Sequence, residues 1–256
     1  MSAFKGLYLK DLKISASTFF IGIILLNLIT LISLGLKEYF DEPMIPAVIF
    51  FVVVILHAFY LPGMLLSSLQ IEGQSQLWLH NPNSTIKLLL SKIAAGLTYY
   101  AVSIAASMLL ARLSVSGLEL SNELSGFSEM VNENLFVMVG GITLASIYIN
   151  VWILFYWSLY HSLKVVPILN QIRWLVLLIV WIVLTTIGNF LSNTPFVRVM
   201  KNKGTFNISV FETEMSGNSV SAQMASINIT TIIVYILLTI GVFLASVWLL
   251  ERKVEV

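Results

Sequence analysis

Few residues in this sequence have the type and spacing that catalysis or metal binding requires. The three histidines, His57, His80 and His161, fall in different segments, and no carboxylate lies at ligand spacing from His80. The sequence contains no cysteine, no His-Glu-x-x-His zinc motif, no Gly-x-Ser-x-Gly elbow and no Gly-x-x-x-x-Gly-Lys-Ser/Thr phosphate loop. We therefore predict that the chain is not an enzyme and holds no catalytic residue, metal or cofactor of its own.

The composition is that of a protein dissolved in lipid. Of the 256 residues, 58% are apolar and only 11% are charged, whereas about a quarter of the residues of an ordinary soluble domain are charged. The net charge is +1, so no general basic field attracts nucleic acid. Nucleic acid is therefore excluded as an expected partner.

Six stretches are long and apolar enough to cross a bilayer, which takes about 20 residues of helix. They run approximately over residues 17–36, 44–69, 93–111, 135–159, 174–191 and 229–250. None contains Asp, Glu, Lys or Arg, each of which costs roughly 2.5–3.5 kcal/mol at the centre of a span. We predict an all-α integral membrane protein with a single transmembrane domain over residues 1–256.

The distribution of cations predicts the orientation. An even number of spans puts both termini on one side, and the side richer in Lys and Arg is usually cytoplasmic. With cytoplasmic termini, nine of the 14 cationic residues lie inside, and the sequence predicts this topology. The nine are Lys5, Lys10, Lys13, Lys87, Lys92, Lys164, Arg173, Arg252 and Lys253.

The segment before the first span, Ser2 to Lys13, has the pattern of an interfacial helix. Four apolar or aromatic residues share one side, two lysines lie opposite, and Asp11 interrupts the apolar side. The alternative is a positively charged flank that only fixes topology. The residues of the predicted interfacial helix are Phe4, Leu7, Tyr8, Lys10, Leu12 and Lys13.

The second span contains Pro62 and Gly63 in its cytoplasmic third. A proline removes one backbone donor and bends a helix. The pair is a candidate hinge, and a fixed kink is the alternative.

The segment between the second and third spans, Glu72 to Lys92, is polar, then aromatic, and is stopped by Pro82. Leu77, Trp78 and Leu79 are too apolar for a linker that faces water, so we expect them to contact membrane or a partner protein. An amphipathic entry into the third span with no partner is the alternative.

Three short stretches carry a resemblance to a known family. The pattern Lys5-Gly-Leu-Tyr-Leu-Lys-Asp-Leu12, followed by Leu77-Trp-Leu-His-Asn-Pro82 and Lys87-Leu-Leu-Leu-Ser-Lys92, resembles bacterial ABC transporter permeases of type 2. The resemblance implies an interfacial helix before six spans and a short cytoplasmic coupling helix that docks on an ATPase subunit. The docking residues it implies are Glu72, Gln74, Gln76, Leu77, Trp78, Leu79, His80, Asn81 and Pro82.

The resemblance also implies the function: the membrane subunit of an ATP-driven exporter in a bacterial plasma membrane. A separate cytoplasmic ATPase would bind ATP and Mg, and a second permease subunit, identical or not, would complete the pathway. The expected cargo is hydrophobic or amphipathic, with antimicrobial or toxin-like peptides first and lipids or small-molecule antibiotics as alternatives. A noncatalytic membrane scaffold or immunity protein is the alternative function.

Two further features have more than one interpretation. The outer segment from Ser192 to Ile227 alternates apolar residues between Phe206 and Phe211, which predicts a small hairpin or lid. Aromatic residues in the second half of the chain are candidates for lining a pathway, and interfacial anchoring or helix packing is the alternative. They are Trp152, Tyr156, Trp157, Tyr160, Trp174 and Trp181.

Overall fold

The computed structural model describes residues 3–42, 44–75, 82–115, 122–194, 205–206, 211–215, 218–222 and 227–253. The chain divides into two compact units, residues 1–154 and 155–255. The first unit is helical and the second combines helices with two short sheets. In order along the first unit, its elements are α1 (Ala3–Phe40), α2 (Met44–Leu56), η1 (His57–Phe59), α3 (Tyr60–Ser75), α4 (Thr85–Val115) and the larger part of α5 (Asn122–Ser162).

Six helices in the described residues are long and apolar enough to cross a membrane, as the sequence predicts. The chain is therefore a multi-pass membrane protein. The six candidate spans are Ala3–Phe40, Ile45–Gly73, Thr85–Leu110, Val137–Ser162, Arg173–Phe190 and Ile229–Glu251.

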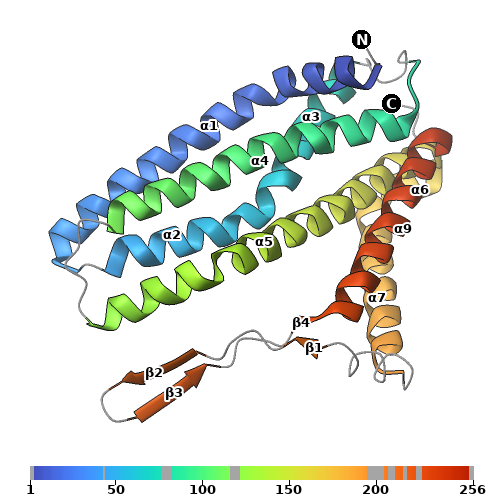
Figure 1. The fold of residues 1–256 in the computed structure, drawn as a ribbon. Helices are drawn as coiled ribbons and strands as arrows, with labels where there is room; N and C mark the ends of the chain where they lie inside the picture. Colours follow the sequence, from blue (N-terminus) through green and yellow to red (C-terminus); the bar gives the residue numbers. More distant parts are fainter. Residues whose placement is uncertain are drawn as a thin grey trace. The chain divides into compact units, whose positions relative to one another are not determined.

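The first unit is built around the contact between α1 and α4, which lie side by side (Figure 1). A second contact, between α3 and α4, is a buried apolar cluster of Leu61 with Tyr100 and Ile104. Gly96 of α4 lets the helices approach, because a Cβ there would lie 3.2 Å from a methyl carbon of Leu61. The burial of these apolar side chains stabilises the packing of α3 on α4.

The first two spans form a tight hairpin. Helix α1 ends at Phe40 because Asp41 adopts the left-handed conformation with φ 51°, which Asp tolerates better than most residues. The N–H of Glu42 donates to the carbonyl of Lys37 at 3.2 Å. These contacts close the end of α1 and direct the chain into α2.

The second span bends one turn before Pro62. Because Pro62 has no N–H, the carbonyl of Ala58 loses its usual helical donor. The backbone tightens into the 3-10 turn His57–Phe59 between α2 and α3, and the chain changes direction there (Figure 1). The predicted bend is present, and its use as a hinge, together with the role of Gly63, stays a prediction.

The predicted interfacial segment forms the first turns of α1, which runs without interruption from Ala3 into the first span. No Pro or mid-segment break separates the two parts, and every residue from Lys13 to Phe20 is helical. The structure thus describes one long helix where the sequence predicted an interfacial helix followed by a span. Placement of its first turns in the membrane interface stays a prediction.

The second unit contains the end of α5 and the last two spans. In order, its further elements are η2 (Leu163–Val165), α6 (Pro167–Gln171), α7 (Arg173–Ser192), β1 (Thr205–Phe206), β2 (Phe211–Met215), β3 (Asn218–Ala222), β4 (Ile227–Asn228) and α9 (Ile229–Lys253). Strand β1 pairs antiparallel with β4, and β2 pairs antiparallel with β3.

The sheets correct the position of the predicted outer hairpin. Strands β2 and β3 pair from Phe211 opposite Ala222 to Met215 opposite Asn218, so the hairpin begins where the apolar alternation ends. Phe206 pairs instead with Ile227, next to the start of α9. Ile208 and Val210 lie outside the described residues. A hairpin is therefore present in the outer segment, but it is formed by residues 211–215 and 218–222 and not by the alternating residues before them.

Candidate functional site

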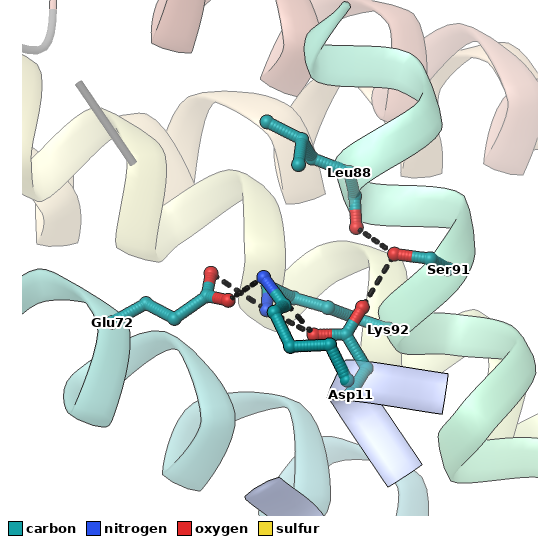
Figure 2. Close-up of polar contacts among 6 residues, drawn as sticks. Asp11, Glu72, Leu88, Ser91 and Lys92 are labelled. Carbon is teal, nitrogen blue, oxygen red and sulfur yellow. Dashed lines mark hydrogen bonds and ion pairs between the residues drawn. The ribbon is translucent and has the colours of Figure 1, made fainter. Parts of the chain in front are cut away.

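The most unusual feature of the described residues is a group of buried charges in the first unit. Four charged side chains meet there: Lys10 and Asp11 from α1, Glu72 from the last turn of α3, and Lys92 from α4. We call these four residues the ionic cluster. Figure 2 shows Lys92 between the carboxylates of Asp11 and Glu72.

Lys92 is the centre of the ionic cluster. Its Nζ lies 2.9 Å from Oδ1 of Asp11 and 2.7 Å from Oε2 of Glu72. Lys10 donates to the other oxygen of Glu72 and lies 3.7 Å from Asp11 Oδ1. Lys92 thus bridges the two acids, and Lys10 pairs with the remaining oxygen of Glu72.

The second oxygen of Asp11 is also occupied. The hydroxyl of Ser91 lies within hydrogen-bonding distance of Asp11 Oδ2 and 2.8 Å from the carbonyl oxygen of Leu88 (Figure 2). Because a serine has one proton and a carbonyl or carboxylate only accepts, this hydroxyl is shared between two acceptors. Every oxygen of both carboxylates therefore has a donor.

Burial makes the ionic cluster sensitive to the loss of any inner member. The side chains of Lys92 and Asp11 are 1% exposed and that of Glu72 is 3% exposed, whereas Lys10 is 35% exposed. Two carboxylates and two ammonium groups sum to zero charge, which limits the desolvation cost. Removing one partner from such a group leaves an uncompensated buried charge and costs about 3–5 kcal/mol.

Neutral contacts extend the same junction along α1 and α4. The Tyr99 hydroxyl donates to the carbonyl of Leu12 at 2.9 Å, and the Tyr8 and Thr98 hydroxyl oxygens lie 2.8 Å apart. The ring of Tyr99 stacks on Phe19 with centroids 4.5 Å apart. These contacts hold the first half of α1 against the part of α4 that follows Lys92.

The ionic cluster brackets the segment that the resemblance assigns to ATPase docking. Glu72 lies near the end of α3, and Lys92 lies in the second turn of α4. Gln76, Leu77, Trp78, Leu79, His80 and Asn81 lie outside the described residues. Gln74 is in the last turns of α3, and Pro82 is exposed ahead of α4. The paired Glu72 and Lys92 therefore join α3 to α4, the two helices that flank the docking residues.

The predicted interfacial residues divide into two groups. Phe4 and Lys13 are exposed, while Leu7 is buried and Tyr8 and Leu12 are partly buried. Lys10 pairs with Glu72 and is 35% exposed. Asp11 interrupts the apolar side of the segment in the sequence, and in the structure it is a buried ion-pair partner of Lys92.

His57 forms a second buried polar group, inside the helical bundle. Its Nδ1 lies 2.8 Å from the carbonyl of Val53, and its Nε2 lies 3.2 Å from Ser103 Oγ and 3.3 Å from Ser107 Oγ. Because a carbonyl only accepts, Nδ1 carries the proton and Nε2 accepts. The histidine thus joins the bend of the second span to α4.

The described residues gather no group of three or more His, Cys, Asp or Glu side chains around a possible metal position. The two acids of the ionic cluster are instead held by lysines. The ionic cluster therefore has a mechanical effect, because it joins α1, α3 and α4 to one another.

The ionic cluster was not predicted from the sequence, although one residue pointed to it. Asp11 lies among apolar residues on one side of α1, and an acid on an apolar face needs a partner. That partner is Lys92, 81 residues further along the chain. Nothing in the sequence alone selected Lys92 from the other cations predicted on the same side of the membrane.

Comparison with known proteins gives one distant relative. No family model matches the sequence. The chain is 29% identical over 171 residues to the Uncharacterized protein YhcE of Bacillus subtilis (strain 168), a match that covers 64% of this chain and 64% of the relative's own length. No solved structure matches.

Proposed function

We propose that the chain is the membrane subunit of an ATP-driven bacterial exporter of the ABC type 2 class, located in the plasma membrane. ATP and Mg²⁺ are bound by a separate cytoplasmic ATPase, and two permease subunits form the pathway. In this proposal the N-terminal turns of α1 lie in the membrane interface. Residues 72–82 contain the coupling element that rests on the ATPase.

The ionic cluster is the observation that supports this proposal most. A partner that pushes on residues 76–82 acts on the ends of α3 and α4, which Glu72 and Lys92 join at 2.7 Å. Lys92 also holds Asp11 of α1 at 2.9 Å. A displacement of the docking segment would therefore move the first, second and third spans together, since buried ion pairs resist separation.

The cargo follows from the character of the spans. Their apolar surface favours hydrophobic or amphipathic cargo, and an antimicrobial or toxin-like peptide is our first assignment. The sequence contains no phosphate loop, and the six spans predicted from it contain no Asp, Glu, Lys or Arg. Work on the cargo would then come from the partner ATPase.

The docking assignment is tested by co-expression with candidate ABC ATPases and purification in detergent. Leu77→Glu and Trp78→Glu put a charge into the predicted contact, and each should reduce ATPase recovery at least about tenfold, as expected for the loss of an interface hot spot. Gln171→Glu, an exposed change in α6, is the matched control and should leave recovery unchanged. Full recovery with both docking variants would refute the assignment.

Transport is tested in vesicles that contain only this chain and its ATPase. ATP-dependent movement of a labelled amphipathic peptide is the expected result, with phospholipid and small-molecule antibiotic probes run in parallel. Movement of lipid alone would change the cargo assignment. Stable ATPase binding with no movement of any probe would favour the scaffold or immunity function over export.

A further inference from the structure

The turn between α5 and α7 carries two cations with no acid near them in the sequence. The sequence contains no Asp or Glu between Glu133 and Glu212. Lys164 lies in η2 and is exposed, and Arg173 is the first residue of α7. Among the described residues, no ion pair includes either cation. The turn is therefore a local excess of positive charge on a chain whose net charge is only +1.

The guanidinium of Arg173 is held in place with one donor unused. Its Nε donates to the carbonyl of Asn170 at 3.0 Å, and its central carbon lies 4.4 Å from the centroid of the Tyr160 ring. Its Nη1 is buried and has no hydrogen-bond partner among the described residues. Buried donors are normally satisfied, so this geometry indicates an acceptor that is not part of the described protein.

Aromatic side chains surround this position. The ring centroids of Tyr160 and Trp174 lie 5.3 Å apart, and those of Trp157 and His161 lie 4.3 Å apart. Trp174 is 75% exposed. Tyr and Trp gather at the level of lipid headgroups, where an apolar ring meets a polar surface.

The turn also lies where a membrane surface is expected. It connects the candidate spans Val137–Ser162 and Arg173–Phe190, and within the second of these no residue is buried. Helix α6 packs against both η2 and α7, so Lys164 in η2 and Arg173 at the start of α7 belong to one short, compact turn.

We propose that Lys164 and Arg173 bind the phosphate of an anionic phospholipid, whose acyl chains lie along the exposed side of α7. The guanidinium supplies directed hydrogen bonds and the lysine supplies a mobile second charge. The predicted cytoplasmic location of the turn agrees with the anionic character of the inner leaflet. This inference depends on membrane residence and not on the exporter assignment.

Native mass spectrometry of the full-length chain in detergent tests the proposal, with phosphatidylglycerol and phosphatidylcholine as the two probes. Wild type should retain phosphatidylglycerol selectively. Lys164→Gln and Arg173→Gln should each weaken retention about fivefold, the equivalent of one cation near a charged surface, and the double change more. Lys87→Gln, the loss of an exposed lysine on the same predicted side of the membrane, should have no effect.

Three outcomes would overturn the proposal. Equal retention of the two lipids by wild type would show that charge does not select the ligand. Undiminished phosphatidylglycerol binding by the double variant would place the site elsewhere. Displacement of phosphatidylglycerol by millimolar inorganic phosphate would identify a free anion as the ligand. Because Lys164 is exposed, its variant tests the site without disturbing the fold.

Discussion

The ionic cluster and the α5–α7 turn use the same kinds of charge in opposite ways. In the ionic cluster, Lys92 is 1% exposed and sits within 3 Å of two carboxylates. In the turn, Arg173 is held by a backbone carbonyl and an aromatic ring, and no carboxylate among the described residues faces it. Charges that are balanced internally fasten helices, whereas cations left without an acid are available to bind an external anion.

The largest effect is expected from Lys92→Met. The change leaves Asp11 without an ammonium at 2.9 Å and leaves Glu72 with Lys10 alone, so the free energy of unfolding should fall by about 3–5 kcal/mol. Denaturation in a fixed detergent measures the loss. Lys87→Met is the matched control, because Lys87 is an exposed lysine on the same helix.

Replacing the three buried charges of the ionic cluster together separates the cost of an unpaired charge from the cost of altered packing. The triple variant Asp11→Asn, Glu72→Gln, Lys92→Met removes all three inner charges together, so no unpaired charge is left buried. It should recover most of the stability that Lys92→Met loses. If the triple variant is as unstable as the single variant, the loss comes from packing and not from an orphaned charge.

A smaller effect is expected from Lys10→Gln. Lys10 donates to a buried carboxylate, which favours a contribution of about 1.5–3 kcal/mol, but its 35% exposure screens the charge. We expect a loss of about 1.5 kcal/mol in the same denaturation measurement. A loss equal to that of Lys92→Met would mean that both lysines are equally important and that Lys92 is not the centre.

Tyr99→Phe should cost still less. The change removes one neutral hydrogen bond, from the Tyr99 hydroxyl to the Leu12 carbonyl, and keeps the stacking on Phe19. A loss of about 1 kcal/mol is expected. Because no charge is exposed or orphaned, added salt should leave this difference unchanged, and a strong salt dependence would argue against the assignment.

The smallest change in stability is expected from Arg173→Gln in lipid-free detergent. The variant loses the hydrogen bond to the Asn170 carbonyl and the cation–π contact with Tyr160, but it also removes a buried donor that has no partner among the described residues. The losses and the gain oppose each other. The free energy of unfolding should change by less than about 1 kcal/mol. A loss comparable to that of Lys92→Met would show that Arg173 has an internal structural role.

The spans were predictable from sequence because their signal is local. A long apolar stretch must be a helix in lipid, where backbone groups have no water to bond, and all six predicted stretches lie in helices. The bend before Pro62 was predictable for the same reason, since a missing N–H acts one turn away. The continuity of α1 was not predictable from the sequence. The polar residues near Lys13 end the apolar stretch, but they do not end the helix.

The ionic cluster required information that the sequence carries only across long separations. Lys10 and Glu72 are 62 residues apart, and Asp11 and Lys92 are 81 apart. The pairs form because α1 packs on α3 and α4, while α3 packs on α4 through Leu61, Tyr100 and Ile104. In the sequence, Lys92 contributes to the excess of cations that predicts the topology, but no local pattern identifies Asp11 and Glu72 as its partners.

The most direct test of the account is a double-mutant cycle between Asp11→Asn and Lys92→Met, measured by reversible unfolding in detergent. The buried contact at 2.9 Å predicts a coupling energy of about 2 kcal/mol or more, because neighbours in one ion-pair network are not additive. A coupling energy near zero would contradict the claim that this contact fastens α1 to α4.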